Sequence, residues 1–335
     1  MATLLYDPAF LKHDPGTHVE SPRRLEAVLS TLQATGLAGR LRAAAPPDPP
    51  AGAIERIHSA EMLKTVETAC DRGRPLDLDT PTSPGTWRAA QLAVGGAVEA
   101  ARLALSGEPA FSLARPPGHH ATPTSPMGFC LFNNAAIAAE WALREGGARR
   151  VAIFDPDVHH GNGTQDTFYD RDDVLFVSLH QSPLYPGTGH LDETGAGKGE
   201  GFTINLPVPP LTGEAACGQL FEEVVRPALR EFRPDLLILS MGYDAHWRDP
   251  LGSLLLTANF YGRTVAALAR DHPRVCAVLE GGYDALALGR SCAATLAALA
   301  GTALLFPEDV APKEREVVPS TAPYRKVHGE RWSVG

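Results

Sequence analysis

Residues 151–163 read Val151-Ala-Ile-Phe-Asp155-Pro-Asp157-Val-His159-His160-Gly-Asn162-Gly163. The apolar run at the start is typical of a fully buried strand, and the residues after it offer two carboxylates, two imidazoles and an amide. Asp157 and His159 are two positions apart, so in extended backbone both side chains project to the same side. Carboxylate and imidazole donors that converge from one side suit zinc. A polar strand-to-helix turn with a capping Asp is the alternative, but the density of ligands favours a metal site.

Composition limits the class of protein. The chain has 335 residues, of which 44% are hydrophobic and 21% are charged, so it can bury a large core. A formal net charge of -9 argues against a basic footprint for nucleic acid. The N-terminus lacks a signal-peptide pattern, and no apolar run approaches the roughly 18 residues of a membrane helix. We therefore expect direct binding to neither nucleic acid nor membrane.

Cysteine usage indicates a reducing compartment. The cysteines are odd in number, and no two of them have C-x-x-C spacing. A disulfide framework is therefore not expected, and we predict a cytoplasmic protein.

Apolar segments alternate with helical patterns along most of the chain. Segments typical of buried strands occur at residues 3–6, 110–114, 151–154, 174–179, 202–206, 236–240 and 275–279. One helix is predicted to start at Ser21-Pro22, and others to cover residues 53–57, 59–69, 85–105, 133–143, 164–169, 214–230, 258–269 and 286–299. Apolar strands that alternate with helices imply an α/β fold, with a mostly parallel central sheet and helices on both faces. We expect a single domain at residues 1–305, and a tail at residues 306–335 packed loosely on it or extending from it.

Polar clusters share one position in this pattern, because each follows a predicted strand. They are Arg115-Pro-Pro-Gly-His119-His120, Asp155 to Asn162, Ser178-Leu-His180, Gly242-Tyr-Asp244-Ala-His246 and Glu280-Gly-Gly-Tyr283. In open parallel sheets the loops at the carboxyl ends of the strands build the active site. We therefore expect these clusters to meet at one edge of the sheet.

Together these clusters resemble the histone deacetylase superfamily, which includes bacterial histone-deacetylase-like amidohydrolases and acetylpolyamine amidohydrolases. The motifs follow in family order: His18-Val-Glu-Ser-Pro-Arg-Arg-Leu, Pro116-Pro-Gly-His119-His120, Gly128-Phe129-Cys130, the stretch from Asp155 to Gly163, Tyr185-Pro-Gly-Thr-Gly, Asp244-Ala-His-Trp-Arg-Asp249-Pro-Leu251-Gly and Leu279-Glu-Gly-Gly-Tyr283. The resemblance runs from about Tyr6 to Ala300, nearly the whole chain. It implies an arginase-like α/β fold and a zinc-dependent deacetylase, and Asn162 is consistent with the class II-like and bacterial branch.

The resemblance implies one catalytic zinc per chain, held by Asp157, His159 and Asp244. Sequence spacing supports only the first two ligands, and the third rests on the resemblance. Two carboxylates and one neutral imidazole would balance a dication and leave room for a water and a substrate carbonyl. Whether zinc or ferrous iron occupies the site in the cell is left open.

Catalytic roles are carried over in the same way. Hydrolysis of an unactivated amide needs a proton acceptor that later becomes a donor, and histidine suits this near neutral pH. His120 is assigned as general base and then acid, with His119 as its electrostatic partner. Asp155 is expected to orient His119, and Asn162 to orient His120. Tyr283 would donate its hydroxyl to the tetrahedral oxyanion.

The substrate contacts that the resemblance implies form a narrow tunnel for an acyl-lysine. Phe129 and Tyr185 match its aromatic walls, and Leu251 matches a further wall position. The remaining candidates are Gly128 through its carbonyl, Gly282 beside the oxyanion tyrosine, and Asp79 at the rim.

The family also binds a structural monovalent cation, usually potassium. The matching ligands, several of them through backbone oxygens, are Asp155, Asp157, His159, Ser178 and Leu179.

The preferred prediction is a zinc-dependent amidohydrolase that acts on acyl-lysine in a peptide or protein. Leu251 offers no carboxylate to a second ammonium group, so an N-acetylpolyamine is the second choice, and a carboxylester is a further alternative. A dinuclear manganese ureohydrolase would share the fold, but His246 stands where that class usually has another acid. A non-catalytic acyl-lysine binder is disfavoured because both tandem histidines and Tyr283 are present. The oligomeric state is left open, with a homo-oligomer among the options.

Overall fold

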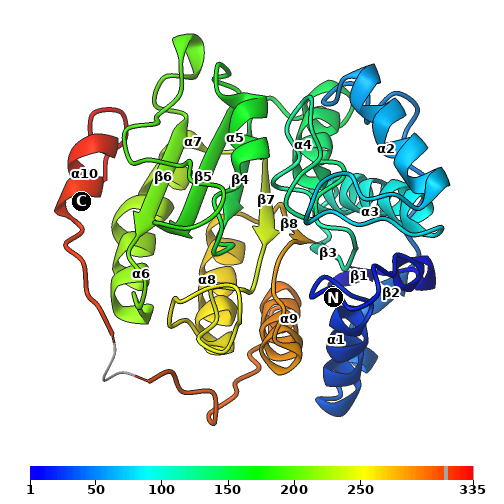
Figure 1. Cartoon of the computed structure of the whole chain (residues 1–335). Helices are drawn as coiled ribbons and strands as arrows, with labels where there is room; N and C mark the ends of the chain where they lie inside the picture. The colour runs from blue at the N-terminus through cyan, green and yellow to red at the C-terminus, as the bar shows by residue number, and fades with distance from the viewer. Residues whose placement is uncertain (313–315, 335) are drawn as a thin grey trace.

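A parallel sheet of eight strands forms the centre of the protein (Figure 1). The computed structural model describes residues 1–312 and 316–334. Its strands are β1 (Thr3–Leu5), β2 (Arg42–Ala44), β3 (Ala110–Ser112), β4 (Val151–Asp155), β5 (Val174–Gln181), β6 (Thr203–Val208), β7 (Leu236–Met241) and β8 (Val275–Leu279). They lie in the order β2-β1-β3-β8-β7-β4-β5-β6, and every neighbouring pair is parallel. The predicted α/β fold is confirmed.

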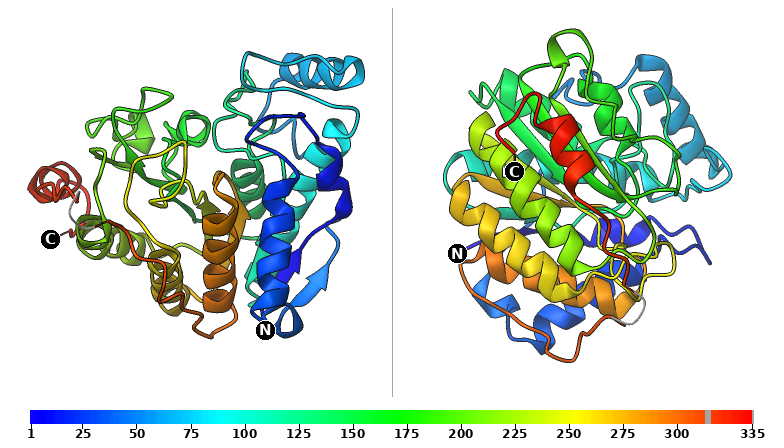
Figure 2. Two further views of the ribbon diagram at one scale, coloured as in Figure 1. Left: turned by 60° about the horizontal axis from the view of Figure 1, so that its bottom comes forward. Right: turned by 90° about the vertical axis from the view of Figure 1, so that its left-hand side faces the viewer.

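Helices cover both faces of the sheet. They are α1 (Arg23–Ala34), α2 (Ala60–Arg72), α3 (Thr86–Leu105), α4 (Asn134–Arg144), α5 (Asn162–Phe168), α6 (Glu214–Leu220), α7 (Arg226–Phe232), α8 (Ala258–Asp271), α9 (Ala285–Leu299) and α10 (Ala322–His328). Alternate residues of β4 point into different cores: Ala152 and Phe154 pack mainly with α1 and α6 to α9, whereas Val151 and Ile153 pack with α2 to α5. Figure 2 shows α1, α9 and α8 side by side over one face. Within the described residues, no helix is long and apolar enough to cross a membrane.

The structure differs from the predicted elements in several places, and three of these differences have a clear physical reason. Residues 42–44 form an edge strand that local propensity did not signal, because pairing with β1 supplies its backbone partners. Residues 53–57 form turns, since so short a segment makes too few helical bonds to offset nucleation. A π-helical turn at Phe221–Val225 divides the helix predicted at 214–230. It ends two residues before Pro227, whose missing N–H removes an α-helical bond there.

The C-terminal tail packs along the β6 side of the domain, where Figure 1 shows α10 beside that strand. Tyr324 donates its hydroxyl to the Pro207 carbonyl at 2.5 Å, and His328 Nε2 lies 3.0 Å from the Asn205 carbonyl. Trp332 is buried among aromatic rings. The tail thus covers polar backbone groups of an edge strand, which would otherwise be open to pairing with another chain. The boundary at residue 305 stays a prediction.

Candidate metal centre and active site

The polar clusters follow β3, β8, β7, β4 and β5, which are consecutive neighbours in the middle of the sheet. Parallel strands end at the same edge, so the loops that carry the clusters converge there, as expected. The candidate site lies at this edge.

Asp157, His159 and Asp244 come together at the carboxyl ends of β4 and β7. His159 Nδ1 is 3.0 Å from Asp157 Oδ1 and 3.3 Å from Asp244 Oδ2. Both carboxylates are fully buried. The pairing of β4 with β7 therefore brings Asp244 to the two residues that sequence spacing had grouped.

Two glycines make room for these carboxylates. A Cβ on Gly242 would lie 1.8 Å from Asp157 Oδ2, and a Cβ on Gly281 would lie 2.1 Å from Asp244 Oδ2. The Gly281 N–H donates to Asp157 Oδ2 at 2.9 Å, and the Val158 N–H donates to Asp244 Oδ1 at 2.8 Å. Asp244 Oδ2 remains buried with no hydrogen-bond partner among residues 1–312 and 316–334. An unpartnered buried carboxylate oxygen is costly, so this donor set fits a bound cation.

The cluster carries an excess of negative charge. Burial and the Asp157 carboxylate raise the pKa of Asp244. Burial acts to lower the pKa of His159, but the nearby carboxylates of Asp157 and Asp244 outweigh this and raise that pKa to about 10. A proton on His159 offsets part of the charge, and a divalent cation bound by the neutral imidazole would offset it in the same way.

The tandem histidines lie beside the cluster, with ring centroids 4.0 Å apart. His119 Nδ1 is 3.0 Å from Asp155 Oδ2, and its Nε2 is 3.8 Å from Asp157 Oδ2. His120 Nδ1 is 2.8 Å from Asn162 Oδ1. An amide oxygen only accepts, so His120 donates from Nδ1 and its neutral ring keeps Nε2 as an acceptor.

The two rings differ in their affinity for a proton. Burial acts to lower the pKa of His119, but the carboxylates of Asp157 and Asp155 raise it well above its usual value. Burial, with the charges on His119 and His159, holds the pKa of His120 well below its usual value. His120 is therefore the neutral ring of the pair and can accept a proton.

A cavity of about 250 Å³ opens onto these groups, and His119, His120, His159 and Tyr283 contribute to its wall. The predicted substrate contacts that line it are Asp79, Gly128, Phe129, Tyr185 and Leu251. Two aromatic contacts shape the cavity. The Phe129 ring stands edge-on to Tyr283 with centroids 5.7 Å apart, and Tyr185 stands edge-on to His120 at 5.1 Å.

A buried ionic network supports this site, and sequence patterns did not reveal it. Arg115 pairs with Glu20 through two nitrogen–oxygen contacts of 2.5 Å, and Glu20 also accepts from Arg24 Nη1 at 2.9 Å. Arg24 in turn donates to the carbonyls of Gly282 and Glu280 at 2.7 and 2.5 Å. These carbonyls belong to the turn after β8, so the network holds that turn. Gly282 presents its carbonyl to Arg24 and does not line the cavity.

Two further buried acids hold the loops that carry the tandem histidines and Tyr283. Glu280 Oε2 accepts from the N–H groups of Gly118 and His119 at 2.6 and 3.1 Å. Asp249 Oδ2 accepts from the Tyr283 N–H at 2.6 Å. Burial is the main cause that raises the pKa of each acid to about 7. The signal of Glu280 in the sequence was a charge between an apolar run and two glycines, where burial requires a partner, whereas Asp249 lies in a polar stretch that gives no such signal.

The predicted potassium ligands also lie near one another. Asp155 and Ser178 are register partners in β4 and β5, and Leu179 follows Ser178. The carbonyl oxygens of Asp157 and His159 accept no backbone hydrogen bond from the part of the chain that the structure describes.

Comparisons with known proteins agree on one family. Residues 18–299 match the histone deacetylase domain. A probable deacetylase of Archaeoglobus fulgidus is 40% identical over 324 residues, which cover 92% of this chain and 90% of the relative. The histone deacetylase-like amidohydrolase of Pseudomonas aeruginosa is 40% identical over 277 residues, which cover 80% of this chain and 73% of the relative. The crystal structure of the HDA15 HD domain superposes with a TM-score of 0.89 at 34% identity, covering 99% of this chain and 95% of that one.

The fold and site define a parallel α/β protein with a buried carboxylate–imidazole centre, and the chain belongs to the histone deacetylase domain family. The resemblance inferred from the motifs is confirmed. The protein is a deacetylase or amidohydrolase of that family.

Proposed function

We propose that the protein is a zinc-dependent deacylase that hydrolyses acetyl and other N-acyl groups from acyl-lysine side chains. The observation that carries this proposal is Asp244 Oδ2, which is buried without a hydrogen-bond partner among the described residues. It lies with Asp157 and His159 in one buried cluster, and His159 lines a cavity whose wall is otherwise largely apolar and aromatic. The proposed metal ligands therefore reach, through His159, the space that an extended substrate would enter.

Asp157, His159 and Asp244 would hold the metal, and the formal charge of this set balances a dication. When bound, zinc polarises the substrate carbonyl and lowers the pKa of the attacking water. The chain holds the two carboxylates in place through the N–H groups of Gly281 and Val158.

His120 is the proposed general base and then general acid. Its ring lines the cavity and its Nδ1 is tied to Asn162, so Nε2 is free to take a proton and return it to the leaving amine. His119 is bonded to Asp155 and has a raised pKa, so it would keep its proton and supply positive charge beside the reaction.

Tyr283 is the proposed donor to the oxyanion. It lines the cavity, and burial raises the pKa of its hydroxyl well above the usual value, so the group stays protonated at neutral pH. The bond from its N–H to Asp249 fixes the backbone from which the side chain projects.

The cavity walls favour a long aliphatic stem. Phe129 and Tyr185 present rings to the cavity, and Leu251 adds an apolar surface with no charge to attract a second ammonium group. Gly128 would present its carbonyl to the substrate. Asp79 has an exposed side chain at the cavity and would accept hydrogen bonds from the substrate backbone.

A structural potassium ion is proposed at the neighbouring set of oxygens. Asp155 and Ser178 would contribute side-chain oxygens, and Asp157, His159 and Leu179 would contribute carbonyls. The register of β4 on β5 supports this assignment, as do the Asp157 and His159 carbonyls, which accept no backbone hydrogen bond among the described residues, because oxygen donors suit hard cations.

The substrate class is tested with zinc-loaded protein on an acetyl-lysine peptide and N8-acetylspermidine side by side. We expect the peptide to be preferred. Preference for the spermidine derivative would make the protein an acetylpolyamine amidohydrolase. If zinc-bound protein hydrolyses neither substrate, acetyl is not the acyl group that the enzyme removes. Longer acyl chains and esters are then assayed. Metal analysis should find one transition ion in this cluster, whereas two would indicate a dinuclear centre.

The oxyanion role is tested with Tyr283→Phe, which should lower kcat by about 10²- to 10³-fold with little change in zinc content. Tyr324→Phe is the matched control, because it removes a tail hydroxyl that is bonded to the Pro207 carbonyl. Wild-type turnover by the Tyr283 variant would refute the role.

A further inference from the structure

A carboxylate from the C-terminal tail anchors the loop that carries Asp244. Asp309 is buried, its Oδ2 lies 2.8 Å from His246 Nε2, and its Oδ1 accepts from Trp247 Nε1 at 2.8 Å. His246 and Trp247 follow Asp244 by two and three positions. A residue far along the chain is therefore bonded to the loop of a proposed metal ligand.

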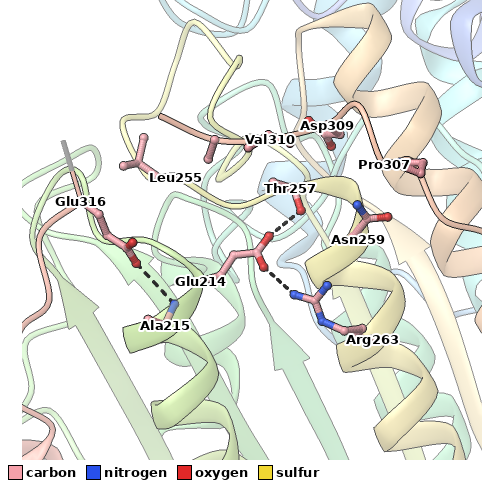
Figure 3. A pocket seen from close by; sticks show the side chains of 11 residues that line it. Glu214, Ala215, Leu255, Thr257, Asn259, Arg263, Pro307, Asp309, Val310 and Glu316 are labelled. Atoms are coloured by element: carbon pink, nitrogen blue, oxygen red, sulfur yellow. Dashed lines mark hydrogen bonds and ion pairs between the residues drawn. The ribbon is translucent and has the colours of Figure 1, made fainter. Parts of the chain in front are cut away.

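Asp309 also serves the start of α8. Its Oδ2 accepts from the Ala258 N–H at 2.8 Å. Thr257, the N-cap of this helix, makes no capping bond, because its hydroxyl donates to Glu214. Figure 3 shows this pair, and Asp309 on the tail, around a cavity of about 300 Å³ between the tail and the starts of α6 and α8. Free N–H groups at a helix start attract a carboxylate, so Asp309 takes over the capping role.

The geometry of the anchor leaves little freedom. His246 Nδ1 accepts from the Arg248 N–H at 3.2 Å, so its Nε2 must donate to Asp309 in the neutral ring. The tail itself is fastened nearby, since Asn259 and Phe306 exchange two hydrogen bonds of 2.9 Å. Three donors from two elements thus converge on one buried carboxylate, which is held in place by its own neighbours.

The anchored loop contributes to the proposed active site at three points. It begins with Asp244 in the metal cluster. It continues to Asp249, which accepts from the Tyr283 N–H, and to Leu251, which lines the cavity. A shift of this loop would therefore move a ligand, the support of the oxyanion donor and a wall of the cavity together.

We propose that Asp309 is a positioning residue for the metal centre, which holds the loop of residues 244–251 in its metal-binding conformation through His246 and Trp247. This inference rests on the proposed function, because it assumes that Asp244 is a metal ligand. Its consequence is that the tail forms part of the support of the active site.

The test compares Asp309→Asn with wild type in the full-length chain. Asparagine keeps the size, but its NH₂ group must face one of the three donors. We measure the zinc dissociation constant by competition with a chelator, and the visible spectrum of the cobalt-substituted protein as a signature of ligand geometry. Groups that orient metal ligands are worth about 10- to 100-fold in metal affinity, and since Asp309 acts through the loop we expect the low end, about tenfold weaker binding. The cobalt spectrum should change as well.

Two variants complete the design. Tyr324→Phe removes a different hydrogen bond of the tail and should leave zinc affinity and the cobalt spectrum at wild-type values. Trp247→Phe removes one of the three donors to Asp309 and should weaken zinc binding by a smaller factor. If Asp309→Asn does not fold, the comparison of Trp247→Phe with wild type replaces it as the test.

The outcomes separate this inference from the proposed function. The inference is overturned if folded Asp309→Asn has the zinc affinity and cobalt spectrum of the wild type, whatever stability it loses. If Asp309→Asn does not fold, the same result in folded Trp247→Phe overturns it. Wild-type protein that binds no zinc, or binds it equally well after Asp157→Ala, would instead overturn the proposed metal site.

Discussion

Glu20→Gln tests the buried ionic network behind the active site. Glu20 and Arg115 are 1% and 0% exposed, and two contacts of 2.5 Å join their charged groups. Arg24, which is 2% exposed, donates to the same carboxylate at 2.9 Å. The substitution keeps the volume and removes the negative charge between two buried guanidinium groups.

Removal of one partner from a buried ion pair costs about 3–5 kcal/mol, because the other charge stays buried without compensation. Since two guanidinium groups lose their partner here, we expect the upper part of that range, about 4–5 kcal/mol. This is a large share of the roughly 5–15 kcal/mol that stabilises a typical domain. The free energy of unfolding is measured by urea denaturation. Turnover of the folded variant should also fall, because Arg24 holds the turn that carries Tyr283.

Glu99→Gln is the matched control, since it breaks a pair with Arg102, which is 51% exposed. An exposed pair is worth about 0–1 kcal/mol. A loss of unfolding free energy in Glu20→Gln no larger than the loss in Glu99→Gln would refute the reasoning that the substitution leaves two buried guanidinium charges uncompensated.

Glu20 also predicts a pH dependence of stability. Burial acts to raise the pKa of Glu20, but the Arg115 guanidinium and His13 outweigh it and hold that pKa well below its usual value. An unfolded chain has a glutamate pKa of about 4.3. The lowered pKa stabilises the folded state above about pH 4.3, and this contribution is lost as the pH falls toward the folded value. The difference in unfolding free energy between wild type and Glu20→Gln should therefore shrink in acid, and a constant difference would contradict the lowered pKa.

Two further substitutions address the loops and the metal cradle. Glu280→Ala leaves two backbone N–H groups of the tandem-histidine loop without an acceptor and should cost about 2–6 kcal/mol in urea denaturation, at about 1–3 kcal/mol for each buried donor. Glu280→Gln, whose amide oxygen can still accept, should cost clearly less, and equal losses would argue against this bonding role. Gly242→Ala would place a Cβ 1.8 Å from Asp157 Oδ2 and should abolish stoichiometric zinc binding in folded, dialysed protein. Gly39→Ala, where a Cβ meets nothing within 4 Å, is the control and should bind zinc normally. Equal zinc binding by both variants would show that the structure around Gly242 can shift to accommodate a Cβ.

Much of the fold was predictable because its signals are local. The apolar runs at 151–154, 236–240 and 275–279 correspond to central strands, since a strand buried on both faces needs apolar residues throughout. The edge strand at 42–44 carries no such run and is defined by its partner β1. The π-helical turn before Pro227 shows the same limit, because periodicity predicts a helix without its local distortions.

The sequence by itself determined the strand–helix alternation, the Asp157–His159 pair and the tandem histidines, because these depend on spacings of a few residues. The resemblance added Asp244 and the roles of the site residues. Only the tertiary structure decided which distant charges meet: Glu20 with Arg115, 95 positions apart, and His246 with Asp309, 63 apart. Such pairs leave no periodic signal in the chain. They form because the order of the strands brings separate loops to one edge of the sheet, where buried charges must find partners.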